Sequence, residues 1–162
     1  MKGVYKINID DKIFSQMIRT SNGIVARNWK GEIVKAWAMK EEKKREPRLE
    51  KTLTIRTTLQ MEKEAGWRKI DIQLDCKSII GSITTNNSQD CNIAKVREDI
   101  QELREVLDQC TFSFIYRIGN ELCHRLANFA LKLVNDVKWE TNFPRWIKVL
   151  AQKDNMGNLP LL

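Results

Sequence analysis

Long hydrophobic runs are absent from this sequence. No segment approaches the ~18 uninterrupted apolar residues that a membrane-spanning helix requires. The opening residues MKGVYKINIDD do not contain the apolar core of a signal peptide, and internal repeats and low-complexity segments are missing as well. We therefore expect a soluble, intracellular protein of the nucleus or the cytoplasm that has no membrane partner.

Cysteines with the spacing of a metal site or a disulfide framework are also missing. The four cysteines occupy positions 76, 91, 110 and 123 and form no CxxC motif. Cys123 precedes His124, the only histidine. Neighbours on a helix point about 100° apart, so this pair cannot share a zinc ion without a second pair of ligands. The pattern predicts reduced thiols rather than disulfides.

The composition is that of a basic globular domain. The chain has 162 residues, of which 42% are hydrophobic, enough for a single domain with its own core. We expect one monomeric domain over residues 1–162. The net charge of +7 and the pI of about 9.3 favour a polyanionic partner such as nucleic acid.

The periodicity of apolar residues predicts five strands and three long helices. The strands are expected over residues 4–10, 22–29, 32–39, 69–75 and 111–117. The helices are expected over residues 48–65, 93–107 and 120–137, with a short helix opening near residue 76. Gly66 marks the end of the first helix.

The connections between these elements predict the topology. The first three strands follow one another closely, with a turn at Lys30–Gly31, and so form an antiparallel meander. The last two strands follow helical crossovers, which favour parallel pairing. We predict an α/β fold with a five-stranded mixed sheet, three antiparallel strands then two parallel ones, flanked by helices.

Two of the predicted strands end on an aspartate. Asp10 ends the first strand, and Asp75 ends the strand KIDIQLD that follows the first helix. If these strands are parallel neighbours, the two residues lie about 5 Å apart, at the edge where open sheets bind ligands. Their repulsion would then be relieved by a divalent cation, a shared proton or a basic side chain. Alternatively, each aspartate caps the turn or helix after it, and periodicity alone favours this capping role.

Three segments resemble a known family. The segments are YKINID, LTIRTTLQMEKEAGWRKIDIQLDCKSII and FSFIYRIGNELCHRLANFAL. In this order they resemble the ribonuclease H fold, and most of all the plant reverse-transcriptase-like branch of the type 1 ribonuclease H family, whose members are free proteins or remnants of retroelements. The resemblance runs from Gly3 to about Asp154, and Trp139, Pro144 and Trp146 are similar to the closing helix of that branch. It implies a core over about 3–137 and a closing helix over about 143–152.

The resemblance implies an activity and a metal site. Family members cut the RNA strand of an RNA–DNA hybrid with two Mg²⁺ ions, held roughly 4 Å apart by four carboxylates. Asp10 and Asp75 match the first and third carboxylates. Lys51 stands at the second position and His124 at the fourth, where this branch often has histidine. Glu50 is adjacent to Lys51, but a rotation of about 100° should turn it away from the metals.

The replaced positions weaken the expected metal site. An ammonium in place of a carboxylate should lower metal affinity by orders of magnitude, and imidazole is a poor ligand for Mg²⁺. Lys51 is then expected to neutralise Asp10 and Asp75 in place of the metal. The same resemblance matches Arg117 and Asn120 to the family's Arg-x-x-Asn turn, where we expect Asn120 to cap the last core helix.

Three hypotheses follow for the function. The first is a nucleic-acid-binding domain of ribonuclease H ancestry with impaired catalysis, for which an RNA–DNA hybrid is the expected partner. The second is an active metal-dependent hybrid endoribonuclease that works with a depleted site and prefers Mn²⁺. The third is a degenerate retroelement-derived fragment that binds another protein or has no role. Net charge favours the first over the third, and Lys51 favours the first over the second.

Overall fold

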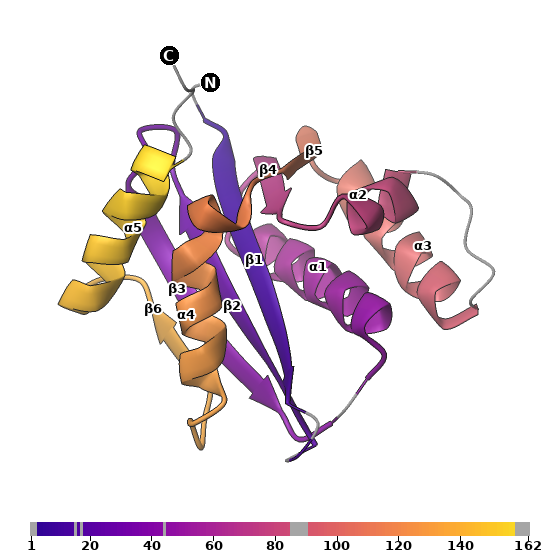
Figure 1. Ribbon diagram of the computed structural model, residues 1–162. Helices are drawn as coiled ribbons and strands as arrows, with labels where there is room; N and C mark the ends of the chain where they lie inside the picture. Colours follow the sequence, from indigo (N-terminus) through magenta and orange to yellow (C-terminus); the bar gives the residue numbers. More distant parts are fainter. Residues whose placement is uncertain (1–2, 15, 17, 44, 85–90, 158–162) are drawn as a thin grey trace.

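One mixed β-sheet with helices on both faces forms the body of the protein (Figure 1). The computed structural model describes residues 3–14, 16, 18–43, 45–84 and 91–157. Within these residues, none of the helices combines the length and the apolar character needed to cross a membrane. All four cysteines are free thiols, as predicted.

The sheet has six strands. They are β1 (Tyr5–Phe14), β2 (Arg19–Arg27), β3 (Ile33–Glu41), β4 (Lys69–Leu74), β5 (Gln109–Phe114) and β6 (Val137–Trp139). Their order across the sheet is β5-β4-β1-β2-β3-β6. β1, β2 and β3 form the predicted antiparallel meander, and β4 pairs in parallel with both β1 and β5. The predicted α/β fold with a mixed sheet is therefore confirmed.

The strand number and several element boundaries differ from the prediction. The helix predicted over 120–137 ends at Ala130, and Val137 begins β6, which pairs with β3. β6 has only three residues, too few for alternation to reveal it, and Leu133 and Val137 match the helical spacing by chance. β1 and β2 also extend further toward their hairpin than predicted, because their pairing runs as far as Phe14 and Arg19.

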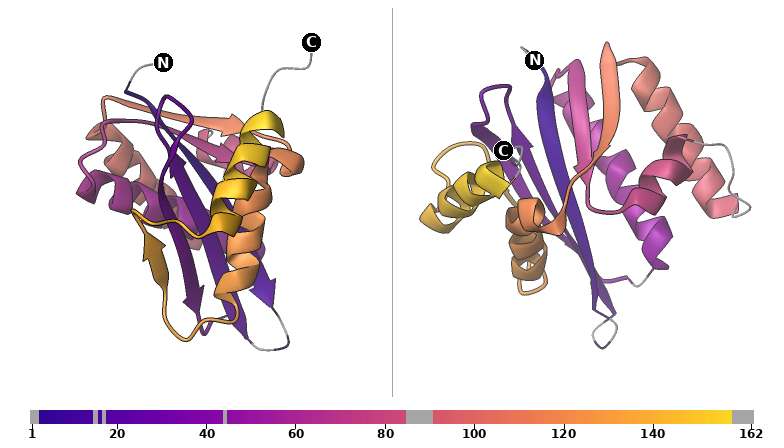
Figure 2. Two further views of the ribbon diagram at one scale, coloured as in Figure 1. Left: turned by 90° about the vertical axis from the view of Figure 1, so that its left-hand side faces the viewer. Right: turned by 45° about the horizontal axis from the view of Figure 1, so that its top comes forward.

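The helices divide between the two faces of the sheet (Figure 2). They are α1 (Pro47–Glu64), α2 (Lys77–Thr84), α3 (Cys91–Glu105), the 3-10 turn η2 (Arg117–Asn120), α4 (Glu121–Ala130) and α5 (Arg145–Gly157). α1, α2 and α3 share a core with the isoleucines of β1 and β4, including Ile7 and Ile72, to which α3 contributes Ile100. α4 and α5 pack on the other face against Val25, Ala36 and other small residues of β2 and β3.

Gly23 sets the close approach of α4 to the sheet. A Cβ atom at this position would lie 2.2 Å from the carbonyl oxygen of Cys123 and 2.8 Å from the Cβ of Leu126. No side chain larger than hydrogen therefore fits unless α4 moves away. This contact holds the helix that carries His124 directly over β2.

Glu62 is a carboxyl group buried in the core beneath β3. Its side chain is fully buried, and neither oxygen has a hydrogen-bond partner among the described residues. Burial raises the pKa of Glu62 from 4.5 to about 8, although the nearby charges of Lys35 and Lys138 act in the opposite direction. The folded protein therefore keeps Glu62 neutral at a pH where the unfolded chain ionises it.

We expect this group to make stability fall as pH rises. Above about pH 4.5 the unfolded chain releases the Glu62 proton and the folded chain holds it, so unfolding becomes easier until about pH 8. Between pH 5 and pH 8 the loss should be about 3 kcal/mol. Glu62→Gln should remove this contribution to the pH dependence of stability. Denaturant unfolding at pH 5 and pH 8 measures the free energy of unfolding at each pH.

A neighbouring glutamate provides the control for the Glu62 prediction. Glu64 is exposed on the same helix, so Glu64→Gln should leave the pH dependence unchanged. Burial also raises the pKa of Asp11 to about 8, so part of the slope should remain in the Glu62→Gln variant. An unchanged slope in that variant would show that Glu62 ionises normally in the fold.

Candidate functional site

Asp10 and Asp75 meet at the carboxyl end of β4. Asn8 of β1 pairs with Gln73 of β4 in the parallel register, so the residues two positions further along each strand lie side by side. Both aspartates line one narrow cleft together with Lys51, and its volume is about 10 Å³. Burial and the charge of Asp75 raise the pKa of Asp10. The strand-end geometry expected from the sequence is therefore present.

Lys51 brings a positive charge to this acidic cleft. It lies in the first turns of α1, with its side chain in the cleft lining. Its charge lowers the pKa of the neighbouring Asp11, although burial of that carboxyl has the larger, opposite effect. Among the described residues, no direct ion pair joins Lys51 to an aspartate. The predicted ion pair of Lys51 with Asp10 and Asp75 is therefore not found in the described part of the chain, and the charge of Lys51 acts on Asp11 at a longer range.

Glu50 occupies a different environment from Lys51. Its side chain is buried, and its Oε2 accepts a hydrogen bond from Nη1 of Arg45 at 2.9 Å. It is close enough to Asp11 to raise the pKa of that residue. Glu50 does not line the cleft of Asp10 and Asp75. The arginine pairing holds its carboxylate on the neighbouring side of the helix.

Asp11 is a site residue that the sequence analysis missed. It follows Asp10 on β1, and successive strand residues point to opposite faces. Asp10 therefore faces α4, whereas Asp11 faces α1 and accepts a hydrogen bond from Oγ1 of Thr54 at 2.8 Å. The strand was predicted to end at residue 10, so the sequence analysis did not consider this second carboxyl group. The two consecutive aspartates in the sequence, Asp10 and Asp11, were the signal that could have identified it.

His124 of α4 contacts Asp10 of β1. Its Nδ1 lies 3.1 Å from Oδ2 of Asp10, and this hydrogen bond lowers the pKa of Asp10 against the larger effect of burial. Nη2 of Arg117 lies 3.5 Å from the same nitrogen. His124 therefore contacts the strand-end acid Asp10, and the exposed guanidinium group of Arg117 lies beside it.

The start of α4 is capped by a residue from another helix. Asn120 occupies the N-cap position but makes no capping bond, and its side chain instead donates to the carbonyl oxygen of Ile9 at 3.0 Å. Asp154 of α5 accepts hydrogen bonds from the backbone amides of Glu121 and Leu122 at 3.1 and 3.0 Å. The prediction that the Asn120 side chain caps this helix was therefore wrong.

The residues present do not fit a pair of Mg²⁺ ions. Among the described residues, no group of three or more histidine, cysteine, aspartate or glutamate side chains is arranged to hold a metal ion. The cleft is lined by three aspartates, Asp10, Asp11 and Asp75, and by the ammonium group of Lys51, and its volume suits about one water molecule. Mg²⁺ demands oxygen ligands and retains several waters. The arrangement is better suited to hydrogen bonding than to holding two metal ions.

An open groove adjoins this cleft across His124. Its volume is about 610 Å³, and Arg117, His124 and Arg125 contribute to its lining. Arg117 and Arg125 are exposed, and guanidinium groups bind phosphate oxygens through paired hydrogen bonds. This groove can therefore receive an anionic backbone next to Asp10.

Comparisons with known proteins agree with this architecture. Residues 12–130 match a family described as reverse transcriptase-like. RNase H1 from Halobacterium salinarum is 19% identical, with a TM-score of 0.73 over 79% of this chain and 97% of that chain. LC11-RNase H1, solved in complex with an RNA/DNA hybrid, is 13% identical, with a TM-score of 0.69 over 77% of this chain and 94% of that chain. LC11-RNase H1 was isolated from compost by a metagenomic approach.

A viral polymerase shows the same fold within a much longer chain. The prototype foamy virus protease–reverse transcriptase is 12% identical, with a TM-score of 0.62 over 82% of this chain and 21% of that chain. At these identities the likenesses show the ribonuclease H-like fold alone. No curated protein sequence matches this chain.

Proposed function

Since the chain belongs to the reverse transcriptase-like family, within the ribonuclease H-like superfamily, we propose that it is a monomeric nucleic-acid-binding domain with impaired hybrid-cutting activity. The expected partner is an RNA–DNA hybrid, and the plant branch remains a prediction from the sequence. One observation carries the proposal: Lys51 lines the same cleft as Asp10 and Asp75. A cation tethered there opposes the binding of a second cation.

The charge of the protein supports nucleic-acid binding. The net charge is +7, and Arg117 and Arg125 are exposed beside the strand-end site. Contacts of this kind recognise the phosphate backbone without sequence preference. LC11-RNase H1, which has the same fold, was solved with an RNA/DNA hybrid. Binding that weakens steeply with added salt is therefore the behaviour we propose for this chain.

The retained acids support a second candidate, an active metal-dependent hybrid endoribonuclease. Asp10, Asp11 and Asp75 line the cleft, and Glu50 lies close enough to Asp11 to raise the pKa of that residue. A movement that withdrew Lys51 into solvent would leave an acidic cluster able to attract Mn²⁺. This candidate predicts activity in the unaltered protein.

A cleavage assay separates the two candidates. We expect the unaltered protein to leave a labelled RNA–DNA hybrid intact in Mg²⁺ and in Mn²⁺. The variant carrying Lys51→Glu and His124→Asp should cut the RNA strand, because it restores both replaced carboxylates. Adding Asp10→Asn to that variant should abolish the cutting and so excludes a contaminating nuclease.

The opposite results have distinct meanings. Cleavage by the unaltered protein that disappears with Asp10→Asn would overturn the proposed impairment and establish the second candidate. Fluorescence anisotropy with the same hybrid tests binding independently of cleavage. If the hybrid fails to bind even at low salt, the chain is not a nucleic-acid-binding domain, and the fragment hypothesis gains support.

A further inference from the structure

Two surface grooves meet at Arg125. The groove beside the strand-end site has a volume of about 610 Å³ and contains Arg117, His124 and Arg125. A second groove of about 630 Å³ contains Arg125, Arg145 and Trp146. Because Arg125 lines both, the two grooves join into one track, which runs from the strand-end site across α4 and onto α5. We call this surface the α4–α5 track.

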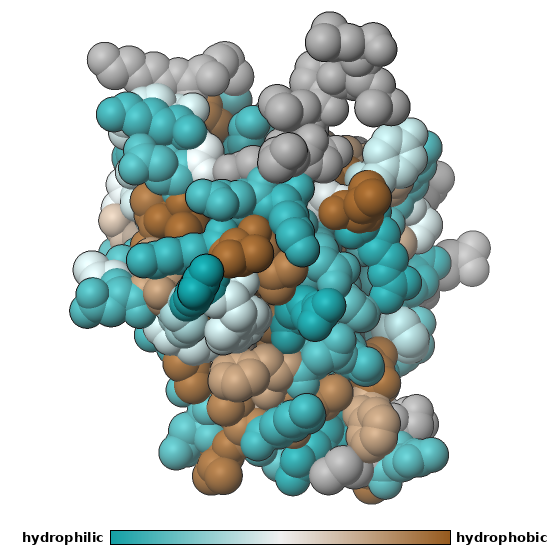
Figure 3. All heavy atoms as spheres, turned by 60° about the vertical axis from the view of Figure 1, so that its left-hand side comes forward, coloured by the Kyte–Doolittle hydropathy of each residue, from teal (hydrophilic) through white to brown (hydrophobic). Residues whose placement is uncertain are grey.

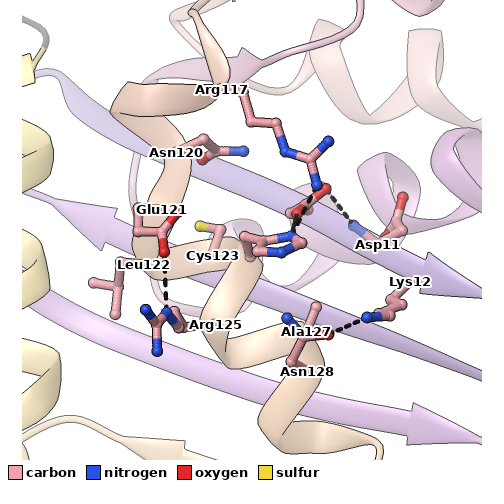
Figure 4. A network of polar contacts seen from close by, with 12 residues as sticks. Asp11, Lys12, Arg117, Asn120, Glu121, Leu122, Cys123, Arg125, Ala127 and Asn128 are labelled. Carbon is pink, nitrogen blue, oxygen red and sulfur yellow. Dashed lines mark hydrogen bonds and ion pairs between the residues drawn. The ribbon is translucent and has the colours of Figure 1, made fainter.

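Positive charge is distributed along the whole α4–α5 track. Arg117 stands at the start of α4, Arg125 in its middle, and Arg145 at the beginning of α5. In Figure 4 Arg117 reaches toward β1, and Arg125 lies on the side of α4 that faces α5. Glu121 is an acid in the track, and its Oε1 is paired with Arg125 at 3.0 Å. Three arginines against one acid favour an anionic occupant.

Trp146 supplies an aromatic surface at the far end of the track. Its ring is half-buried and packs against Phe129, with centroids 5.6 Å apart and planes tilted by 55°. Phe129 also packs against Trp139, with ring centroids 6.2 Å apart. The Trp146 indole is therefore supported by a cluster of aromatic rings. Val149, next to Trp146 in the track lining, is 41% exposed. Figure 3 shows this side of the molecule, where hydrophobic groups lie among hydrophilic ones.

We propose that the α4–α5 track binds a single strand of nucleic acid that continues from the strand-end site. The backbone phosphates contact Arg117, Arg125 and Arg145 in turn, and a base stacks on Trp146. This inference rests on the proposed nucleic-acid function and names the form of the ligand. Basic grooves with aromatic stacking surfaces are the usual means of binding single strands.

The arrangement favours a single strand over the other occupants. A duplex keeps its bases stacked on one another, so it would leave Trp146 without a partner base. A second copy of the chain also carries +7 and would be repelled. An acidic helical peptide would need a longer apolar stripe than the one formed by Trp146, Val149 and Leu150. The arginines instead follow a path, which suits a repeating phosphate backbone.

Fluorescence anisotropy with a labelled oligothymidine of about 15 nucleotides tests the track. We expect Arg145→Gln to weaken binding about fivefold at low salt, since one phosphate contact is lost. Lys153→Gln is the matched control, because Lys153 is an exposed cation on the same helix outside the track. It should change the affinity less than about twofold.

A second comparison isolates base stacking. The unaltered protein should prefer the oligothymidine over an abasic oligomer of equal length by about fivefold or more. Trp146→Leu should remove this preference while keeping an apolar side chain against Phe129. Because each variant is compared with itself on two ligands, a small loss of stability does not imitate the result.

The outcomes separate this inference from the proposed function. If the hybrid binds and Arg145→Gln binds the oligothymidine as tightly as the unaltered protein does, the track is wrong and the proposed function stands. If neither nucleic acid binds, both are wrong. If an acidic helical peptide displaces the oligomer and loses affinity in Arg145→Gln, while the abasic oligomer binds as well as the oligothymidine, the surface is a peptide-docking site and the inference fails.

Discussion

Replacing Lys51 with glutamate is expected to raise the affinity of the protein for Mn²⁺ at least about a hundredfold. The unaltered protein should bind the ion only weakly, because the cleft that contains Asp10 and Asp75 also contains the Lys51 ammonium group. In the variant, a glutamate joins Asp10, Asp11 and Asp75 in the same lining. Calorimetry and the paramagnetic relaxation of water protons measure this binding without any nuclease assay.

Charge arithmetic sets the size of this effect. The substitution changes the local charge by two units, and at about 5 Å from a divalent ion with an effective dielectric constant of about 20 the change exceeds about 10 kcal/mol. A flexible lysine withdraws toward water when a cation arrives, and solvent screens what remains. A hundredfold change corresponds to about 2.8 kcal/mol, so the expected result uses only a fraction of the Coulomb energy.

Lys63 provides a matched control for this substitution. It is an exposed lysine on the same helix, outside the cleft. Lys63→Glu makes the same change in net charge and should leave the Mn²⁺ affinity nearly unchanged. Equal Mn²⁺ affinities in the Lys51→Glu variant and the unaltered protein would show that Lys51 does not oppose metal binding by Asp10 and Asp75. The proposed cause of impaired catalysis would then be lost.

Local periodicity was sufficient to predict most of the sheet. Strand alternation placed Ile7 and Ile72 in the core, and the long helical connections predicted that their strands pair in parallel. β6 was missed because its three residues are held by pairing with β3 rather than by any pattern of their own. The same reason explains the early end of α4 at Ala130, since the chain turns back to make that pairing.

The site was predictable where it depends on strand ends. Asp10 and Asp75 were expected side by side if their strands were parallel neighbours, and the resemblance to the ribonuclease H family favoured this over capping; the structure also brings His124 to Asp10. Asp11 was missed because the predicted strand was too short. The capping of α4 by Asp154 has no local signal at all, because the two partners lie 32 to 33 residues apart in the sequence. Contacts between distant helices require the packed structure.

Asp154 links α5 to the helix that carries His124. Its carboxylate accepts hydrogen bonds from the first two backbone amides of α4. A negative charge at this end of a helix is also stabilised by the helix dipole. Its Oδ2 lies 3.7 Å from Nη2 of Arg27, and both side chains are buried. Nη1 of Arg27 in turn donates to Oδ1 of Asn8 on β1 at 3.0 Å. One carboxylate therefore fixes α5, the start of α4 and the central strands.

We expect Asp154→Ala to lower the free energy of unfolding by about 3–5 kcal/mol, because it leaves the buried Arg27 cation uncompensated and removes two capping bonds. Denaturant unfolding measures the loss. Asp108→Ala is the contrasting control, since Asp108 and Arg68 form an exposed ion pair at 2.9 Å, and breaking such a pair has little effect.

The same substitution should also disturb the strand-end site, and the chain offers a direct reporter of this. His124 is the only histidine, so its imidazole gives one set of NMR signals. If Asp154 positions α4, Asp154→Ala should shift these signals in the folded protein, because His124 moves relative to Asp10. A large loss of stability with unmoved His124 signals would mean that Asp154 only holds α5 in place. Shifted signals would instead show that α5, through Asp154, positions His124 relative to Asp10.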